Sequence, residues 1–407
     1  MSVFLGSVVQ GSTARSIVQE GSDVFLSDLP LSPESARLWE LRGDTIGTPP
    51  VTGEGVFDFR YGPFTGGVPE SGIFHYATYG EKILSVAVDL SKKHRGIEDT
   101  MIGMDVRGAS ALASQLCGNF TVAHSLAFCQ AVESIAHFEP SPRDRSARLI
   151  ALELERVYNH LYVLWRLSSA AAQKIGSSFY GSFFERALRL TEGLSGRRGL
   201  RGYIIPGGVS IPPTQERIGD LAEQIERLRQ DFERTHRRML SSRNFLDRLH
   251  RTATVDGDRA LAIGLTGPSL RATGTKWDLR SKEPLIEEFQ PKGENEGDSF
   301  ARMEVRAREF IESCAIIAGL YRRTSWTGGP SESLPEMSGE GLGAVESPSG
   351  TIAWVVGTEN GRIRYAVVSP PSLFGFQAYA ESVVGNIFTD VPFAYESFGV
   401  SFADAGR

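Results

Sequence analysis

The pattern of apolar and polar residues predicts strands near the beginning of the chain. Three short runs within residues 56–89, FDFRYG, GIFHYATYG and KILSVAVDL, are rich in aromatic and β-branched residues and are separated by glycine. Apolar and polar positions alternate nearly perfectly in the last run, as they do in a strand with one buried face. We therefore expect a small antiparallel sheet whose strands turn at Gly62-Pro63 and at Gly80-Glu81.

Helical periodicity dominates the middle of the chain. Residues 146–173 place leucine and valine at steps of three to five residues, which predicts a helix buried over much of its girth. Residues 214–250 predict another long helix, far more polar, with Thr214 as its N-cap after two prolines. Residues 299–323 predict a third. The sequence therefore predicts a bundle of long helices.

The last third of the chain contains loops and a second β-rich region. Residues 264–284 are rich in glycine and proline, which predicts a loop that lies at the surface or lines a cleft. Residues 328–343 predict a flexible connector. The runs TIAWVV and RIRYAVV then flank Asn360-Gly361, the strongest short signal for a hairpin turn. A helix near residues 374–384 leads into the tail.

These elements predict an α+β fold that is mainly α. It has a small N-terminal antiparallel sheet, a central bundle of long helices and a C-terminal β-hairpin and tail. Residues 1–55, with many Gly, Ser and Pro residues and only short apolar runs, predict a loosely structured extension that packs on a partner. We expect the rest, residues 56–407, to form one domain, divided into the sheet (56–90), the bundle (97–335) and the hairpin with the tail (340–407).

Composition narrows the class of protein. A net charge of −6 provides no broad basic surface, so the sequence predicts no binding to nucleic acid. The only cysteines are Cys117, Cys129 and Cys314, and their uneven spacing indicates a reducing compartment without disulfides. No signal peptide and no run of about 20 apolar residues is evident. We expect a cytoplasmic protein that does not cross the membrane.

Cys117 is the first candidate for chemistry, because it lies in a turn just before an amphipathic helix. A cysteine near a helix N-terminus has a lowered pKa and is a better ligand or nucleophile. The simpler interpretation is a small buried apolar residue, since free cysteine is among the most buried residue types. A soft metal would need a second thiolate, and no other cysteine lies within three residues of Cys117.

The segment LCGNFTVAHSLAFCQAVE (116–133) resembles the proximal ligand motif of group 4, energy-converting [NiFe]-hydrogenase large subunits. KKHRGIE (92–98) resembles a His-Arg-Gly-x-Glu segment shared by those hydrogenases and the quinone-site D-type subunit of complex I. The resemblance extends in the same order over residues 62–407 and implies the [NiFe]-hydrogenase large-subunit-like fold. Further matching segments are RLIALELERVYNHL (148–161), IPGGVS (205–210), LTGPSLRATGTKWDLR (265–280), GAVESPSG (343–350) and RIRYAVVSPPS (362–372).

The chain departs from the hydrogenase pattern at the metal ligands. Those hydrogenases use two Cys-x-x-Cys pairs to bridge nickel and iron, and the corresponding positions here are Cys117 with Phe120 and Ser401 with Asp404. One thiolate of four cannot hold such a cluster. We therefore expect no metal, no cofactor bound by this chain and no hydrogen chemistry.

The chain also departs from the complex I pattern. In that family a histidine of a Gly-Pro-x-His-Pro turn and a tyrosine of a nearby helix address the quinone head. Thr65 stands at the histidine position, no tyrosine occurs between Met101 and Phe128, and Ile205 replaces the arginine expected before Pro-Gly-Gly. The tail SFGVSFADAGR (397–407) nevertheless resembles the complex I ending. The resemblance implies an acceptor pocket lined by Thr65, Cys117, Phe120, His124, Ser401 and Arg407.

A set of polar residues is predicted to relay protons or to steer a redox partner. The resemblance places Glu98 on a proton route beside His94 and Arg95, although a glutamate at a helix start is also favourable without any function. Asp404 is expected to pair with Arg407 opposite Cys117. Charges on a buried helix need partners, so Glu155, Arg156 and His160 predict an internal ion network, while His124 is either a structural or a pocket residue.

The resemblance implies one subunit of a membrane-associated complex that is like complex I and hydrogenase-4. The chain would pass electrons from a partner Fe–S cluster to a quinone-like or other small acceptor, coupled to ion translocation. Its expected partners are a small Fe–S subunit of the complex I B type, a C-type subunit and membrane ion-pumping subunits, on the cytoplasmic face of the inner membrane. The alternatives are a redox-silent coupling or scaffold subunit and, least favoured, a residual hydrogenase.

Overall fold

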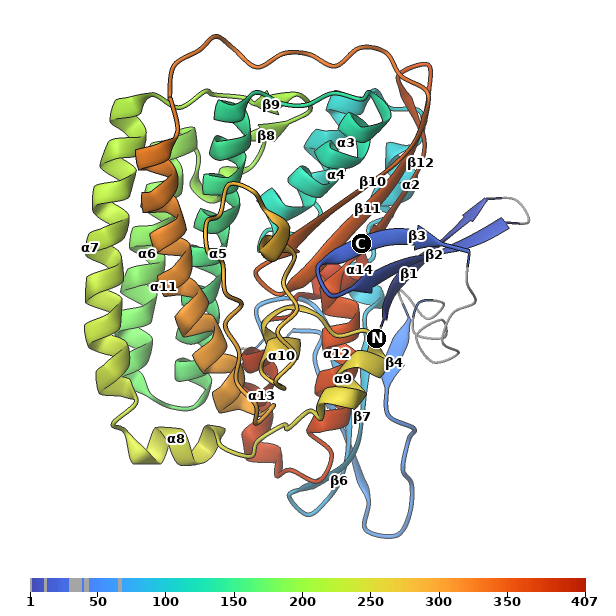
Figure 1. Ribbon diagram of the computed structural model, residues 1–407. Coiled ribbons are helices and arrows are strands. Elements are labelled where there is room, and N and C mark those ends of the chain that lie inside the picture. The colour runs from blue at the N-terminus through green and yellow to red at the C-terminus, as the bar shows by residue number, and fades with distance from the viewer. Residues whose placement is uncertain (1, 11–12, 29–38, 40–43, 65–67) are drawn as a thin grey trace.

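Four long helices lie side by side on one side of the protein and form a bundle (Figure 1). The structure is a computed structural model that describes residues 2–10, 13–28, 39, 44–64 and 68–407. The predicted helix at 299–323 is confirmed with the same bounds, and Thr214 is confirmed as an N-cap whose hydroxyl accepts a hydrogen bond from the Arg217 amide. The bundle helices are α5 (Pro142–Ala170), α6 (Lys174–Ser195), α7 (Gln215–Met239) and α11 (Ser299–Arg323).

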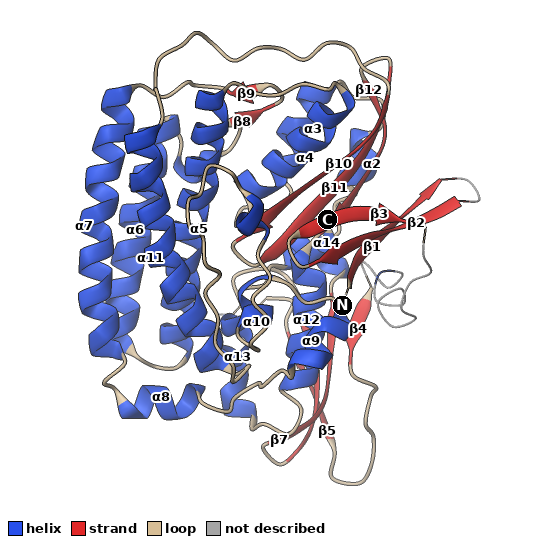
Figure 2. Ribbon diagram, viewed as in Figure 1, coloured by secondary structure: helices blue, strands red, loops and turns tan. Residues whose placement is uncertain are grey.

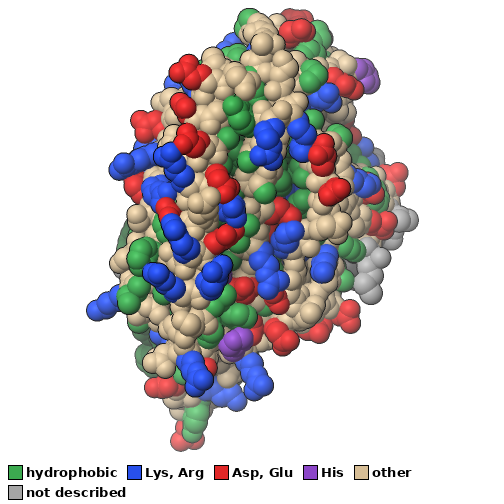
Figure 3. Space-filling model, turned by 60° about the vertical axis from the view of Figure 1, so that its left-hand side comes forward, with side chains coloured by type: hydrophobic (Ala, Val, Ile, Leu, Met, Phe, Trp, Pro, Cys, Tyr) green, Lys and Arg blue, Asp and Glu red, His purple; other side chains and the backbone are tan. Residues whose placement is uncertain are grey.

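The polar helix predicted over residues 214–250 is two helices. The first, α7, ends at Met239, and α8 (Arg243–Leu249) follows after a break at residues 240–242. The Ser241 hydroxyl donates a hydrogen bond to the Arg238 carbonyl at 2.7 Å, and such local bonds by serine compete with helix continuation. The exposed surface of α7 carries charges of both signs in ion pairs such as Arg227 with Glu223, as Figure 3 shows for this side of the protein.

A three-stranded antiparallel sheet lies beside the bundle and packs on α4 (Figure 2). The sequence predicted only a hairpin here, because the glycine-rich first strand was assigned to the connector. Glycine is needed in that strand, since a Cβ at Gly343 would lie 2.1 Å from the Ala127 carbonyl oxygen of α4. The elements are β10 (Gly339–Ser347), β11 (Gly350–Glu359), β12 (Arg362–Ser369) and α4 (Thr121–Ile135).

The predicted N-terminal sheet is present and has a fourth strand. Its order is β4-β7-β6-β5, with the expected two-residue turn at Gly80-Glu81 joining Tyr79 to Lys82. It packs on α12, where the Tyr76 and Tyr379 hydroxyls are 2.7 Å apart. The elements are β4 (Thr45–Gly47), β5 (Phe57–Tyr61), β6 (Ile73–Tyr79), β7 (Lys82–Asp89) and α12 (Pro371–Ser382), and α12 is the predicted helix near residues 374–384.

The sequence predicted a loosely structured extension over residues 1–55, and this is wrong for residues 3–10 and 13–27. They form an antiparallel sheet of β1 (Val3–Gln10), β2 (Thr13–Glu20) and β3 (Asp23–Ser27). Val3, Leu5 and Val8 bury their side chains against Ala353 and Val355 of β11. The apolar runs that were expected to meet a partner therefore pack on the chain itself. Whether residue 55 marks a domain boundary stays a prediction.

Short elements connect these layers and build the tail. No helix among the described residues combines the length and the apolarity that crossing a membrane requires. The short elements are η1 (Ser91–Lys93), α2 (Ile97–Met101), α3 (Val106–Ala113), η2 (Arg198–Leu200), β8 (Ile204–Ile205), β9 (Gly208–Val209), α9 (Gly257–Ile263), α10 (Gly267–Arg271), η3 (Leu279–Lys282), η4 (Phe388–Asp390), α13 (Val391–Phe398) and α14 (Phe402–Gly406).

Candidate functional site

The turn that contains Cys117 meets the C-terminal tail, as the sequence predicted. The Cys117 Sγ atom donates a hydrogen bond to the Ser401 hydroxyl at 3.3 Å, and both residues are fully buried. Ser401 is the N-cap of α14, and its Oγ accepts a hydrogen bond from the Asp404 amide. Two segments that are far apart in the sequence are therefore joined in the protein core.

His124 and Asp404 form a second contact between the same two segments. His124 Nε2 lies 2.9 Å from Asp404 Oδ1, and neither side chain is exposed. The other oxygen of Asp404 accepts a hydrogen bond from the Ser372 amide at 3.1 Å. Asp404 was expected to pair with Arg407, and this prediction was wrong because the carboxylate turns inward to His124. Arg407 instead pairs with Glu98 at 3.5 Å.

The environment of Cys117 disfavours a thiolate. Burial raises the pKa of the Cys117 thiol well above its ordinary value, and the charges of Asp404 and Glu70 raise it further. Cys117 also precedes α4 by several residues, and its hydrogen bond with Ser401 offsets only part of the rise in pKa. The prediction of a lowered pKa was therefore wrong, and the buried-thiol interpretation describes this cysteine better.

Glu70 holds the start of the tail helix and was missed in the sequence. Its carboxylate accepts hydrogen bonds from the Ser401 hydroxyl at 2.8 Å, from the Ala403 amide at 3.2 Å and from the Phe402 amide. An anion at this position satisfies amide groups that a helix leaves unpaired at its N-terminus. The available signal was that Glu70 is the only charged residue between Gly62 and Gly72.

Residues 94–98 clamp the tail from the other side. The His94 ring Nδ1 lies 2.9 Å from the Gly406 carbonyl oxygen. The Arg95 guanidinium donates to the carbonyls of Leu116, Gln115 and Ala403, the last at 3.0 Å, and so joins the Cys117 turn to the tail. The structure brings these residues together as predicted, and their hydrogen bonds to backbone carbonyls hold the tail in place.

Glu98 continues this clamp at the edge of β12. Its Oε1 accepts a hydrogen bond from the Val368 amide at 2.8 Å and lies near the Arg407 guanidinium, which donates to the Val368 carbonyl at 2.6 Å. The side chain of Glu98 is 17% exposed, so this carboxylate is partly open to solvent. Its role on a proton route stays a prediction.

The hollow beside this region is much smaller than the expected pocket. Cys117 contacts Ser401, and both residues are buried, as is Asp404. Side chains therefore fill the space between the turn and the tail. Phe120 is also buried, and Thr65 lies outside the described residues. A cavity of about 20 Å³ lies next to them and is lined by Pro69, Glu70, Asn119, Asn159, Tyr162, Val163, Tyr395, Glu396, Gly399 and Val400.

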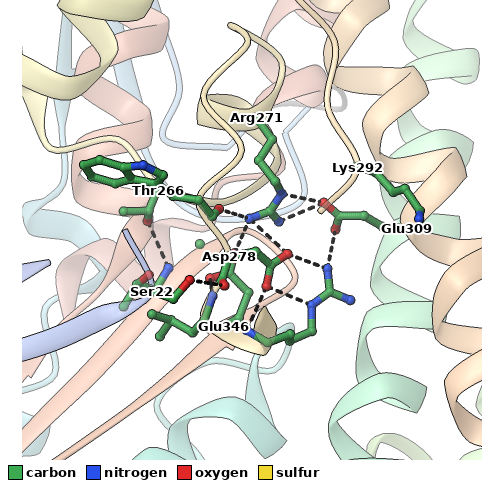
Figure 4. Close-up of polar contacts among 12 residues, drawn as sticks. Ser22, Thr266, Arg271, Asp278, Lys292, Glu309 and Glu346 are labelled. Atoms are coloured by element: carbon green, nitrogen blue, oxygen red, sulfur yellow. Dashed lines mark hydrogen bonds and ion pairs between the residues drawn. The ribbon is translucent and has the colours of Figure 1, made fainter. Parts of the chain in front are cut away.

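The predicted ion network is present and is far larger than the sequence indicated (Figure 4). The Arg271 guanidinium contacts Glu309 at 2.8 Å, Glu346 at 2.6 Å and Asp278 at 3.3 Å. Arg156 and His160 of α5 join the network, with His160 Nε2 lying 2.9 Å from Glu309. All of these groups are buried.

The arginines of this network determine its ionisation. Burial would raise the pKa of Glu309, but Arg271 and Arg280 outweigh this and hold it well below its ordinary value. Burial lowers the pKa of His160 to about 3, so a neutral His160 donates a hydrogen bond to the Glu309 carboxylate. Residues 264–284, which were predicted to lie at the surface or to line a cleft, contribute the buried Arg271, Asp278 and Arg280. Those charges need partners in the core.

Glu155 was predicted to belong to this network but has other partners. Its two oxygens accept hydrogen bonds from the amides of Val122 and Ala123, at 2.7 and 2.9 Å. Phe120, the N-cap of α4, provides no side-chain acceptor, so Glu155 satisfies these amides from the neighbouring helix. Burial raises the pKa of Glu155 to about 7.

Known proteins match nearly the whole chain. Residues 179–334 match the family model "Respiratory-chain NADH dehydrogenase, 49 Kd subunit". The D-type subunit of NADH-quinone oxidoreductase from Thermosipho melanesiensis is 26% identical over 85% of this chain and 98% of the relative, and a D-type subunit from Roseiflexus sp. is 28% identical over 77% and 84%. The chain is therefore similar in sequence to D-type subunits of NADH-quinone oxidoreductase over most of its length.

A solved structure confirms the mainly helical α+β fold. The match is to a chain in the structure of the membrane-bound sulfane sulfur reductase, an archaeal respiratory membrane complex. The TM-score is 0.81 at 24% identity, covering 87% of this chain and 99% of the other. At this identity the likeness shows the fold alone.

The side chains around Cys117 do not suit the bimetallic centre of the [NiFe]-hydrogenases that the sequence resembles. A nickel–iron centre of this kind needs several thiolates, whereas Phe120 provides no ligand atom and the Ser401 hydroxyl is bonded to Glu70 and Cys117. Over the described part of the chain, no group of three or more His, Cys, Asp or Glu side chains is placed to hold a metal ion. No chemical step is therefore assigned to a metal at this site.

Proposed function

We propose that this chain is a subunit of a membrane-associated oxidoreductase that resembles complex I. In that complex, electrons from an Fe–S cluster of a partner subunit reach a quinone-like or other small acceptor beside the turn of Cys117, coupled to ion translocation. The observation that carries the proposal is the junction of this turn with the tail, next to a polar hollow, in a chain that aligns with a D-type subunit of NADH-quinone oxidoreductase over 98% of that relative's length.

The size of the hollow indicates where the acceptor would bind. A volume of about 20 Å³ accommodates one water molecule and no ring. The acceptor head would therefore lie at the mouth, where Pro69 is exposed and Asn119 and Val400 are half-buried. A surface so shallow needs a second wall, which we assign to the small Fe–S subunit of the B type.

The remaining partners follow from the same proposal. They are a C-type subunit and membrane ion-pumping subunits, with this chain peripheral on the cytoplasmic face of the inner membrane. The chain itself would bind no cofactor and would not be a functional hydrogenase, because Cys117 is a single protonated thiol in a sealed environment.

The test uses the purified complex. Its Fe–S clusters are reduced, and their reoxidation by a quinone analogue is followed by EPR together with binding of the analogue. Asn119→Trp should block the mouth and abolish both signals, whereas Asn244→Trp at an exposed position of α8 should preserve them. Absence of analogue binding and of acceptor-dependent reoxidation in the unmodified complex would refute the proposal.

A second candidate is a redox-silent coupling subunit that retains only the shape of its interfaces. The observation that favours it is the complete burial of Cys117, Ser401 and Asp404, which leaves no open space between the turn and the tail. If this candidate is correct, Asn119→Trp will assemble into the complex and leave electron transfer unchanged.

A further inference from the structure

Two carboxyl groups from distant parts of the chain line the same small hollow. Glu70 comes from the loop before β6, and Glu396 comes from α13. The hydrogen bonds of Glu70 to the hydroxyl of Ser401 and to two tail amides commit its oxygens to anchoring α14. Glu396 instead accepts hydrogen bonds from the Arg166 guanidinium, so the two carboxyls have different environments.

The hollow has the properties of a water site. Asn159 is 1% exposed and lines the hollow, and its Oδ1 atom has no hydrogen-bond partner in the described part of the protein. A volume of about 20 Å³ holds one water molecule, and a buried polar atom of this kind is normally satisfied by such a water. A water here would bond Asn159 and lie against both Glu70 and Glu396.

Several charged and titratable groups lie near Glu396. Arg166 of α5 donates two hydrogen bonds to Glu396 Oε1, at 3.0 and 2.8 Å. Tyr162 of α5, Tyr395 of α13 and Glu70 also line the hollow. Burial raises the pKa of Glu396 to about 7, since the charge of Glu70 adds to this effect and Arg166 offsets only part of it.

Arg166 connects Glu396 to solvent. The Arg166 side chain is 22% exposed and the Glu396 side chain 8%, so the pair lies at the boundary between the core and the surface of α5 and α13. Glu396 therefore has access to solvent protons on one side and to the hollow on the other. Its neighbour Glu70 is also partly exposed, but its oxygens are bonded to the Ser401 hydroxyl and to the tail amides.

We propose that Glu396 is the proton donor for the acceptor site, loading from solvent beside Arg166 and delivering through the water in the hollow. This inference rests on the proposed function. A quinone-like acceptor takes two electrons, one at a time, from the reduced Fe–S cluster of the partner, and two protons to form the quinol. Glu396 supplies one of these protons to one acceptor oxygen through the water and is then reprotonated from solvent. The second proton reaches the other acceptor oxygen from solvent at the exposed mouth of the hollow.

The decisive variant is Glu396→Gln, compared with Glu381→Gln as a matched control. Glu381 is also held by two hydrogen bonds from an arginine, Arg259, but it lies away from the hollow. In the intact complex, Glu396→Gln should lower the rate of acceptor reduction by about 100-fold or more, the range of a lost general acid, with unchanged affinity for the quinone analogue. Glu381→Gln should leave the rate unchanged.

The pH profile separates proton donation from a structural effect. The unmodified complex should lose rate as pH rises through about 7, where Glu396 deprotonates. Glu396→Asp should retain a titrating step at a shifted pH, whereas Glu396→Gln should be slow at every pH. Of the protonated-carboxyl infrared bands that titrate near this pH, one should disappear in Glu396→Gln and remain in Glu381→Gln. A band from Glu155, whose pKa is also about 7, should remain in both variants.

The outcomes distinguish this inference from the proposed function. Normal acceptor reduction by Glu396→Gln in a complex that binds the analogue would overturn the inference and leave the proposed function standing. The same holds if Glu381→Gln is equally slow, because a general loss of ion pairs would then explain both variants. If the unmodified complex binds no analogue and reduces no acceptor, the proposed function fails and the inference fails with it.

Discussion

His124 and Asp404 face each other at 2.9 Å with no exposure to solvent, and they join the helix after the Cys117 turn to the last helix of the described chain. The pair belongs to a set of contacts that includes Cys117 with Ser401 and Arg95 with Ala403. The tail is therefore an integral part of the core around the candidate site.

Asp404→Ala should destabilise the protein strongly. It removes the partner of His124 Nε2 and the acceptor of the Ser372 amide, and both groups are buried. Removing one member of a buried pair typically costs about 3–5 kcal/mol. Urea unfolding should show this loss, while Asp247→Ala on the exposed side of α8 should change stability by less than about 0.5 kcal/mol. Equal stabilities would show that the buried pair contributes nothing.

Arg271→Met tests the ion network. The change leaves Glu309, Glu346 and Asp278 without their shared cation in the core, so we expect a loss of at least about 3 kcal/mol or failure to fold. Arg227→Met removes an exposed pair with Glu223, whose side chains are 68% and 63% exposed, and should cost less than about 1 kcal/mol. Thermal unfolding of both variants provides the comparison. A mild effect of Arg271→Met would mean that the network is not held by this residue.

Gly343→Ala should separate β10 from α4. Its Cβ would lie 2.1 Å from the Ala127 carbonyl oxygen, and overpacking of this kind typically costs about 1–3 kcal/mol. Gly193→Ala is the matched change, since nothing lies within 4 Å of a Cβ at that helical position and alanine favours a helix by about 1 kcal/mol. In chemical denaturation, the midpoint should therefore fall for Gly343→Ala and rise for Gly193→Ala.

Arg95→Ala should release the tail without affecting the bundle. It removes the donor to three carbonyls on the Cys117 turn and the tail. Hydrogen exchange at residues 403–406 should accelerate, while exchange in α5 and α11 stays unchanged. Lys92→Ala, which loses only contacts near Asp89 and Ser91, is the control. Unchanged tail exchange in Arg95→Ala would show that other contacts suffice to hold it.

Glu155 should make stability depend on pH. Its pKa is about 7 in the folded chain and near 4.5 in the unfolded chain, so the folded state binds the proton more tightly. Stability is then highest below about pH 4.5 and falls as pH rises to 7, by roughly 3 kcal/mol from this group. Unfolding of Glu155→Gln should show a flatter profile over this range. A profile that is equally steep without Glu155 would assign the dependence to other groups.

The bundle could be predicted because its signals are local. The sequence of residues 299–323 predicted α11, and Thr214 was identified as the N-cap of α7, without reference to any other segment. The resemblance to the complex I and hydrogenase superfamily also indicated correctly that the turn of Cys117 meets the tail. Local periodicity and ordered motifs were sufficient for these parts.

The rest depends on partners that are distant in the sequence. Arg271, Asp278 and Arg280 lie in a glycine-rich stretch that is typical of a surface loop, and only their contacts with α5, α11 and β10 explain their burial. Glu396 likewise has no local signal, and the isolated charge of Glu70 does not reveal its partners, because the hollow that both residues line exists only after folding. The pKa of Cys117 was predicted in the wrong direction. The sequence shows that Cys117 lies near the start of a helix, but it does not show that the thiol is fully buried, and burial has the larger effect on the pKa.

The charges between α5 and α11 also set how these two helices are aligned along their length. Apolar side chains tolerate a shift of one helix past its neighbour, since each can find a similar surface one turn further on. A slip of one turn, about 5.4 Å, would instead separate His160 from Glu309 and Ser313 from Glu153, which are now 2.9 and 2.6 Å apart. The bundle therefore has one permitted register, and any motion transmitted through it must be a tilt or a rotation of the helices together.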